Sequence, residues 1–127
     1  MIGLDTNVLV RYLVDDDEEQ ANAAAILLSS GEQFYVSHIV LCESVWVLRS
    51  SYRRQRHEVA DALQALLRSP QLSIQAPHVA ERALARYASG TADFADYLIA
   101  EDATAAGCAT VATFDKKLLA ESGFVRP

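Results

Sequence analysis

Short strand-like runs alternate with helical stretches along this chain, and this alternation constrains the fold more than any other feature. Apolar, β-branched or aromatic runs lie at residues 1–5, 34–36, 72–74 and 110–114. Helical patterns fill the intervals, at about residues 7–14, 15–30, 38–52, 57–68, 78–88 and 91–107. Strands that alternate with helices predict an α/β fold in which right-handed crossovers join parallel strands and helices cover both faces of the sheet.

The length and composition predict one folded domain over residues 1–127. Hydrophobic residues make up 51% of the chain and charged residues 22%, which is typical of a globular protein and excludes a disordered one. No apolar run approaches the ~18–20 residues that cross a bilayer, and Asp5 interrupts any signal-like segment, so we expect a cytoplasmic protein. The net charge of −6 argues against a surface that is basic throughout, but leaves room for local basic patches.

Several residue types point to structural roles. Cys42 and Cys108 lie in apolar stretches and are expected to be buried thiols rather than a disulfide. Trp46 lies among aliphatic residues and is expected in the core or in an interface. The chain has no glycine-rich phosphate loop, which excludes nucleotide-dependent kinases and dehydrogenases.

Acidic residues occur where a parallel sheet would bring them to one edge. Asp5 ends the first strand-like run, and Asp115 follows the run at 110–114. In open parallel sheets the functional crevice lies outside the carboxyl ends of the strands. Asp93 and Asp96 are three residues apart, so they share one face at the start of a helix. Each also has a structural interpretation, as a turn residue, an N-cap or a first-turn acid.

Glu43 lies among apolar neighbours on the helix expected at 38–52. A charged group in such a place lies at a boundary or has a partner. Several carboxylates that converge repel one another and raise one another's pKa, and a hard divalent cation removes that repulsion. Mg²⁺ and Mn²⁺ prefer oxygen ligands of this kind. The acids together therefore indicate a metal site.

Four segments resemble the PIN-domain proteins, and in particular the VapC-type ribonuclease toxins. These segments are GLDTNVLVRYL, the helix that carries Glu43, ADFADYLIA and VATFDKKL, and they follow the family's order over nearly the whole chain. The resemblance implies a three-layer α/β/α sandwich with a small central, mainly parallel sheet.

The resemblance also assigns the site residues. It implies an acidic quartet around Mg²⁺, with Mn²⁺ as a possible substitute, that consists of Asp5, Glu43, Asp96 and Asp115. Asp5 and Asp96 would bind the cation directly, while Asp93 is an additional acid that, with Glu43 and Asp115, would hold waters or a second metal. Residues expected to orient these carboxylates are Thr6, Asn7 and Thr113.

The activity that the resemblance implies is cleavage of RNA phosphodiesters by a metal-activated water. A VapC-type toxin would pair with a small VapB-like antitoxin, whose arginine-bearing tail would cross the acidic pocket. A homodimer or a hetero-oligomer with the antitoxin is expected. Basic residues near the site either contact RNA or simply lie in solvent, and these are Arg53, Arg54, Lys116 and Lys117.

Other functions fit the sequence less well. A haloacid-dehalogenase-like phosphatase needs a second Asp two residues after the first, where this chain has Asn7. A phospho-receiver domain needs an acidic pair at the first strand and an Asp at the end of a middle strand, and neither feature fits this sequence well. A catalytically silent PIN-fold module that binds metal, RNA or a protein partner remains the alternative to a nuclease.

Overall fold

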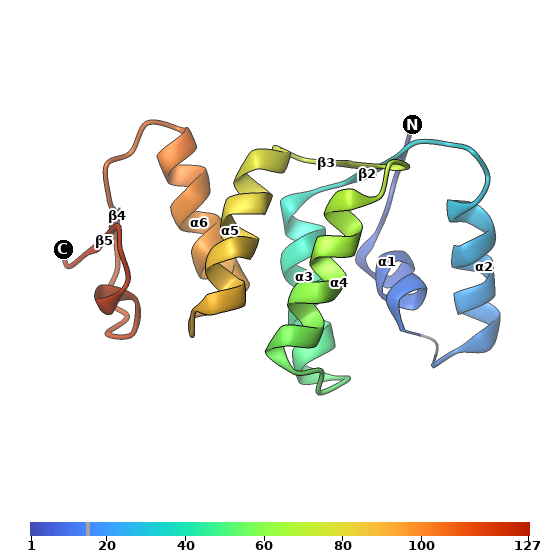
Figure 1. Ribbon diagram of the computed structural model, residues 1–127, viewed down its shortest axis with the longest axis horizontal. Coiled ribbons are helices and arrows are strands. Elements are labelled where there is room, and N and C mark those ends of the chain that lie inside the picture. Colours follow the sequence, from blue (N-terminus) through green and yellow to red (C-terminus); the bar gives the residue numbers. More distant parts are fainter. Residues whose placement is uncertain (15) are drawn as a thin grey trace. The chain divides into compact units, whose positions relative to one another are not determined.

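The structure is a computed structural model that describes residues 1–14 and 16–127. The first residue of the helix expected at 15–30, Asp15, lies outside the described residues. The chain divides into two compact units, Met1–Pro77 and His78–Pro127, and each is described by itself (Figure 1).

The first unit contains three parallel strands in the order β1-β2-β3. These strands are β1 (Ile2–Gly3), β2 (Phe34–Val36) and β3 (Leu72–Ile74). Two helices connect each strand to the next, namely α1 (Thr6–Leu13), α2 (Glu18–Leu28), α3 (His38–Ser50) and α4 (Arg56–Arg68). Register pairs align Ile2 with Phe34 and Phe34 with Leu72. In Figure 1 these four helices are drawn below β2 and β3.

The alternation of side chains in β2 explains how this sheet packs. Phe34 and Val36 are fully buried, whereas Tyr35 between them is 37% exposed. α1 packs against both α2 and α3, and their core residues Leu9 and Leu41 are almost completely buried. The core of the first unit therefore lies between the sheet and its helices.

The second unit consists of two helices followed by a small two-stranded sheet. Its elements are α5 (Pro77–Ser89, whose first residue ends the first unit), α6 (Phe94–Ala105), β4 (Val111–Ala112), the 3₁₀ helix η1 (Leu118–Ala120) and β5 (Phe124–Val125). β4 and β5 are parallel, and Val111 aligns with Phe124. The rings of Tyr87 and Phe94 meet edge to face, with centroids 5.9 Å apart, and join α5 to α6.

The α/β class and the parallel strands predicted from the sequence are confirmed. The strands form two sheets, so Asp5 and Asp115 follow strands of different sheets. β5 was not expected, because two residues near the end of a chain carry too little pattern to predict a strand. Among the described residues, no helix is long and apolar enough to cross a membrane.

Contrary to the expectation for each, Cys108 is not buried and Trp46 does not lie in the core, while the interface also considered for Trp46 stays a prediction. Cys108 is exposed because it follows the turn at Gly107, which has a φ of +98° and ends α6; Cys42 is only half-buried. Burial nevertheless raises the pKa of the Cys42 thiol. Trp46 is 68% exposed and lies outside the core, because α3 buries its other face through residues such as Leu41 and Leu48.

The N-cap of α3 yields a first prediction. The Ser37 side chain accepts a hydrogen bond of 3.2 Å from the Val40 amide. Replacing it with alanine should lower the free energy of unfolding by about 1 kcal/mol in urea denaturation. Ser37→Asp should retain the stability of the wild type, since its carboxylate caps the same amide. Equal losses in both variants would contradict this role.

Candidate acidic site

Asp5 connects β1 to α1. The Leu4 amide donates to the Tyr35 carbonyl and continues the β1–β2 ladder, and the chain then turns into the helix at Asp5. Asp5 is the N-cap of α1, and its Oδ1 accepts a hydrogen bond of 2.9 Å from the Thr6 amide. The side chain is exposed. The structural interpretation of Asp5 as a cap is thus confirmed, and it leaves an exposed carboxylate at the end of a strand.

Thr6 is buried and holds the second acid of the first unit. Its hydroxyl donates a 2.9 Å hydrogen bond to Glu43 Oε1, across 37 residues of sequence. The partner expected for Glu43 is therefore a threonine hydroxyl that lies next to Asp5. This contact agrees with the expectation that Thr6 orients a carboxylate. Asp5 and Glu43 are thus linked through one residue in the first unit.

Asp93 and Asp96 form a reciprocal cap at the start of α6. The Asp93 side chain accepts from the Asp96 amide, and Asp96 Oδ2 accepts from the Asp93 amide at 3.3 Å. This capping box uses the same three-residue spacing that placed both acids on one helix face in the sequence. Asp93 is exposed and Asp96 is half-buried.

The surroundings of Asp96 disfavour its charged form. Burial raises the pKa of Asp96, and the nearby charges of Asp93 and Asp115 raise it further, while the hydrogen bond from the Asp93 amide opposes them. Asp115 is thus close enough to Asp96 to affect its ionisation. Asp93, Asp96 and Asp115 thus belong to the same compact unit, where the charges of Asp93 and Asp115 affect Asp96.

Asp115 lies in the turn that leads from β4 to η1. Its amide donates to Thr113 Oγ1 at 3.0 Å, and its Oδ1 accepts from the Lys117 amide at 2.9 Å. Thr113 therefore shapes the turn that carries Asp115 through its backbone, and the prediction that Thr113 orients a carboxylate stays a prediction. Asp96 and Thr113 also line one cavity of about 160 Å³ in this unit.

The acids divide between the two units. Asp5 and Glu43 belong to the first, and Asp93, Asp96 and Asp115 belong to the second. Over residues 1–14 and 16–127, no three His, Cys, Asp or Glu side chains are arranged so that they would hold a metal ion. The expectation of a metal site that combines all of these acids stays a prediction.

The predicted RNA-binding residues are all exposed. Arg53 and Arg54 lie between α3 and α4, where Arg53 has a φ of +53° and the Arg54 carbonyl accepts a hydrogen bond from Arg49. Lys116 and Lys117 directly follow Asp115. Exposure is compatible with both interpretations of these residues, as RNA contacts or as solvated surface.

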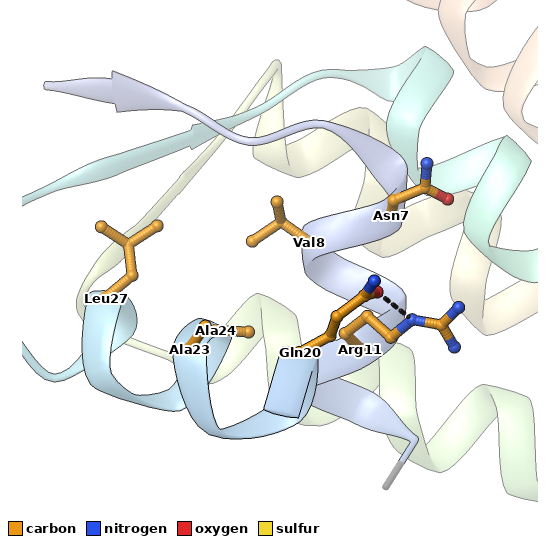
Figure 2. Close-up of a pocket in the computed structure, with 7 residues that line it drawn as sticks. All are labelled: Asn7, Val8, Arg11, Gln20, Ala23, Ala24 and Leu27. Atoms are coloured by element: carbon orange, nitrogen blue, oxygen red, sulfur yellow. Dashed lines mark hydrogen bonds between the residues drawn. The ribbon is translucent and has the colours of Figure 1, made fainter. Parts of the chain in front are cut away.

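Asn7 does not share the role of Thr6 in the described contacts. It lines a cavity of about 250 Å³ between α1 and α2, with apolar walls from Val8, Ala24 and Leu27. Figure 2 shows Asn7, Arg11 and Gln20 at one end of this cavity, where Arg11 Nε donates to Gln20 Oε1 at 2.7 Å.

Sequence reasoning missed a polar network around Arg11. The Arg11 guanidinium donates to Asp16 and to the Tyr52 hydroxyl, and that hydroxyl donates to Asp16, each at 2.7 Å. The bond from Tyr52, together with the bond and charge of Arg11, lowers the pKa of Asp16. Tyr52 is 36 residues away from Asp16, so no local sequence signal marks this contact.

Comparison with known proteins places the chain in a family. The model of the PIN domain matches residues 2–122. The chain belongs to the PIN-domain family. Among solved structures, this PIN domain is similar to VapC20 of Mycobacterium tuberculosis, described as a sarcin–ricin-loop-cleaving toxin, with 22% identity, full coverage of both chains and a TM-score of 0.45. No match to a curated protein reaches significance.

The raised pKa of Asp96 predicts a stability effect with a defined sign. A carboxyl whose pKa is higher in the folded chain than its ordinary value of 3.8 weakens folding as it ionises. Asp96→Asn should therefore raise the Tm of this PIN domain at neutral pH, and the gain should vanish at about pH 3.

Differential scanning calorimetry across this pH range checks the expectation. Asp61→Asn, at an exposed position on α4, is the control and should show no such pH-dependent gain. A lower Tm for Asp96→Asn at neutral pH would contradict the inferred cost of the charged form.

Proposed function

We propose that this PIN domain is a divalent-metal-dependent endoribonuclease and the toxin of a toxin–antitoxin pair. The observation that carries the proposal is the match of the PIN-domain model to residues 2–122, in a chain whose second compact unit carries the carboxylates of Asp93, Asp96 and Asp115 at exposed or half-buried positions. Membership of the PIN-domain family supports a nuclease, and the VapC-like motifs of the sequence support a toxin.

The donor set fits a hard cation. All of the proposed ligand atoms are carboxylate oxygens, which suit Mg²⁺ and Mn²⁺. Within residues 78–127, the ion pairs involve Arg86 and His78, and none of them neutralises Asp93, Asp96 or Asp115. A divalent cation would remove the repulsion that these carboxylates experience.

The proposal gives each residue a separate task. Asp5 and Asp96 would hold the cation directly, and Glu43, Asp93 and Asp115 would hold its waters or a second ion. Thr6 keeps Glu43 in one orientation through its 2.9 Å hydrogen bond, and Thr113 shapes the turn of Asp115. The cation supplies an acidified water and offsets the negative charge of the phosphodiester.

The remaining parts of the proposal concern partners. Arg53, Arg54 and Lys116 contribute positive charge that attracts the RNA backbone to an otherwise acidic chain. A VapB-like antitoxin blocks the site when an arginine of its tail pairs with the carboxylates. The chain forms a homodimer or assembles with its antitoxin, and acts on RNA in the cytoplasm.

Removal of one proposed ligand tests the function. Asp96→Asn should lower the rate of RNA cleavage in Mg²⁺ or Mn²⁺ by more than about 100-fold. The loss of a direct ligand should exceed the roughly 10- to 100-fold loss that is typical of residues that hydrogen-bond to metal ligands. Asp102→Asn changes an exposed acid on the same helix and should leave the rate within about twofold of the wild type. Chelation with EDTA should abolish wild-type cleavage.

A double variant tests whether acids of both units serve one cation. Asp5→Asn alone should cause a loss similar to that of Asp96→Asn, and the two substitutions together should cost little more than either one. Cleavage by Asp96→Asn at the wild-type rate would show that the measured activity does not depend on this site. That result would overturn the proposed nuclease function. Mn²⁺ binding without cleavage of any RNA by the wild type would favour the silent PIN-fold module.

A further inference from the structure

A buried tyrosine, Tyr97, connects the parts of the second unit that carry its acids. Tyr97 directly follows Asp96 in α6, and its side chain is completely buried. Its hydroxyl donates a 2.7 Å hydrogen bond to Glu121 Oε1 and accepts a 3.2 Å hydrogen bond from the Ala92 amide. One oxygen atom thus joins α6, the loop before α6 and the segment after η1.

The two hydrogen bonds depend on each other. A phenol has one O–H to donate, and here the Glu121 carboxylate accepts it. The donor direction is thereby set, and an oxygen lone pair of Tyr97 is directed at the Ala92 amide. Without the carboxylate, the hydroxyl could rotate and the contact with Ala92 would weaken. Glu121 therefore helps to hold the loop through Tyr97.

Arg86 holds Glu121 and the tyrosine ring from α5. Its guanidinium lies 3.8 Å from Glu121 Oε2 and 3.3 Å from Glu101 Oε2, and it donates to the Ser122 carbonyl at 2.9 Å. The guanidinium carbon also lies 5.0 Å from the centroid of the Tyr97 ring. These side chains are at most one-quarter exposed, so the contacts are less screened than those of surface pairs.

The loop before α6 closely surrounds the hydroxyl. A Cβ atom at Gly90 would collide with the Tyr97 hydroxyl and would come within 2.7 Å of the Arg86 carbonyl oxygen. Glycine is thus the residue that lets the chain pass over Tyr97 at this point. The path of residues 90–92 is set by the tyrosine beneath it.

Both ends of this network are adjacent to predicted cation ligands. Ala92 directly precedes Asp93, the N-cap of α6. At the other end, the Asp115 carbonyl accepts from the amides of Leu118 and Leu119 at the start of η1, and Glu121 directly follows η1. The bond between Tyr97 and Glu121 therefore connects the helix of Asp96 to the turn of Asp115.

We propose that Tyr97 and Glu121 are positioning residues that set the spacing of Asp93 and Asp96 relative to Asp115. This inference rests on the proposed function, in which these acids hold a divalent cation. Neither residue touches the substrate or the cation. Their role is to hold the loop that leads to Asp93 and the segment that follows η1 against α6, and so to fix where Asp93, Asp96 and Asp115 lie.

Tyr97→Phe tests the inference because it removes only the hydroxyl. The affinity for Mn²⁺, measured by titration of the metal alone, should fall about tenfold. This loss lies in the range typical of residues that orient metal ligands without binding the metal. The Ala92 amide should exchange its hydrogen faster by NMR, independently of any activity. In cleavage assays at limiting metal, kcat should fall while the KM for RNA changes less than about twofold.

Two further variants separate positioning from general stability. Tyr87→Phe removes a hydroxyl from the other fully buried tyrosine of this unit, on α5, and should leave Mn²⁺ affinity unchanged. Glu121→Gln retains an oxygen that accepts from Tyr97, so it should reduce Mn²⁺ affinity less than Glu121→Ala does. The Glu121 variants also test the inference if Tyr97→Phe does not fold.

The outcomes distinguish this inference from the proposed function. Wild-type Mn²⁺ affinity in both Tyr97→Phe and Glu121→Ala would overturn the positioning role, whether or not Ala92 exchanges faster. Equal losses in Tyr87→Phe and Tyr97→Phe would also overturn it, because the effect would then be one of general stability. A wild-type chain that binds no Mn²⁺ would overturn the proposed function and this inference with it.

Discussion

Backbone amides at the starts of helices hold four of the candidate acids of this chain. Asp5 caps α1, Asp93 and Asp96 cap α6 reciprocally, and Asp115 accepts from the Lys117 amide at the start of η1. A helix start offers unpaired N–H groups and partial positive charge, so it fixes a carboxylate without a basic side chain. Repelling acids can therefore be kept in place while their charge stays available to a ligand.

This way of holding acids has a cost that falls mainly on Asp96. Its carboxyl is half-buried between the charges of Asp93 and Asp115, and its raised pKa records the penalty. The rest of the second unit compensates through apolar packing, such as the edge-to-face contact of Tyr87 with Phe94. Carboxyl groups with perturbed pKa values occur at functional sites and also in structural networks of charges.

Much of the fold could be predicted from local signals. β2 and β3 occur at the predicted residues, and Ser37, Asp93 and Gly107 mark helix ends as their chemistry requires. Caps and periodicity act over a few residues, so a single sequence reveals them. The exposure of Trp46 and Cys108 could not be predicted, because it depends on which helix face finds a partner in three dimensions.

The candidate acids could be named from the sequence, whereas the contacts that hold them could not. The acids were identified from their places at strand and helix ends, and family motifs gave them roles. The contacts that hold them join distant positions: Thr6 with Glu43 spans 37 residues, and Tyr97 with Glu121 spans 24. Pairings of this kind follow from packing, which no spacing rule encodes.

The close fit between Gly90 and Tyr97 has a consequence for how this protein can evolve. A side chain at position 90 and a phenol at position 97 exclude each other, since they compete for the same space. Loss of the tyrosine would not by itself free position 90, because a Cβ atom there would still come within 2.7 Å of the Arg86 carbonyl oxygen. Glycine at position 90 is therefore constrained from two sides, and it should persist in descendants of this chain even where position 97 changes.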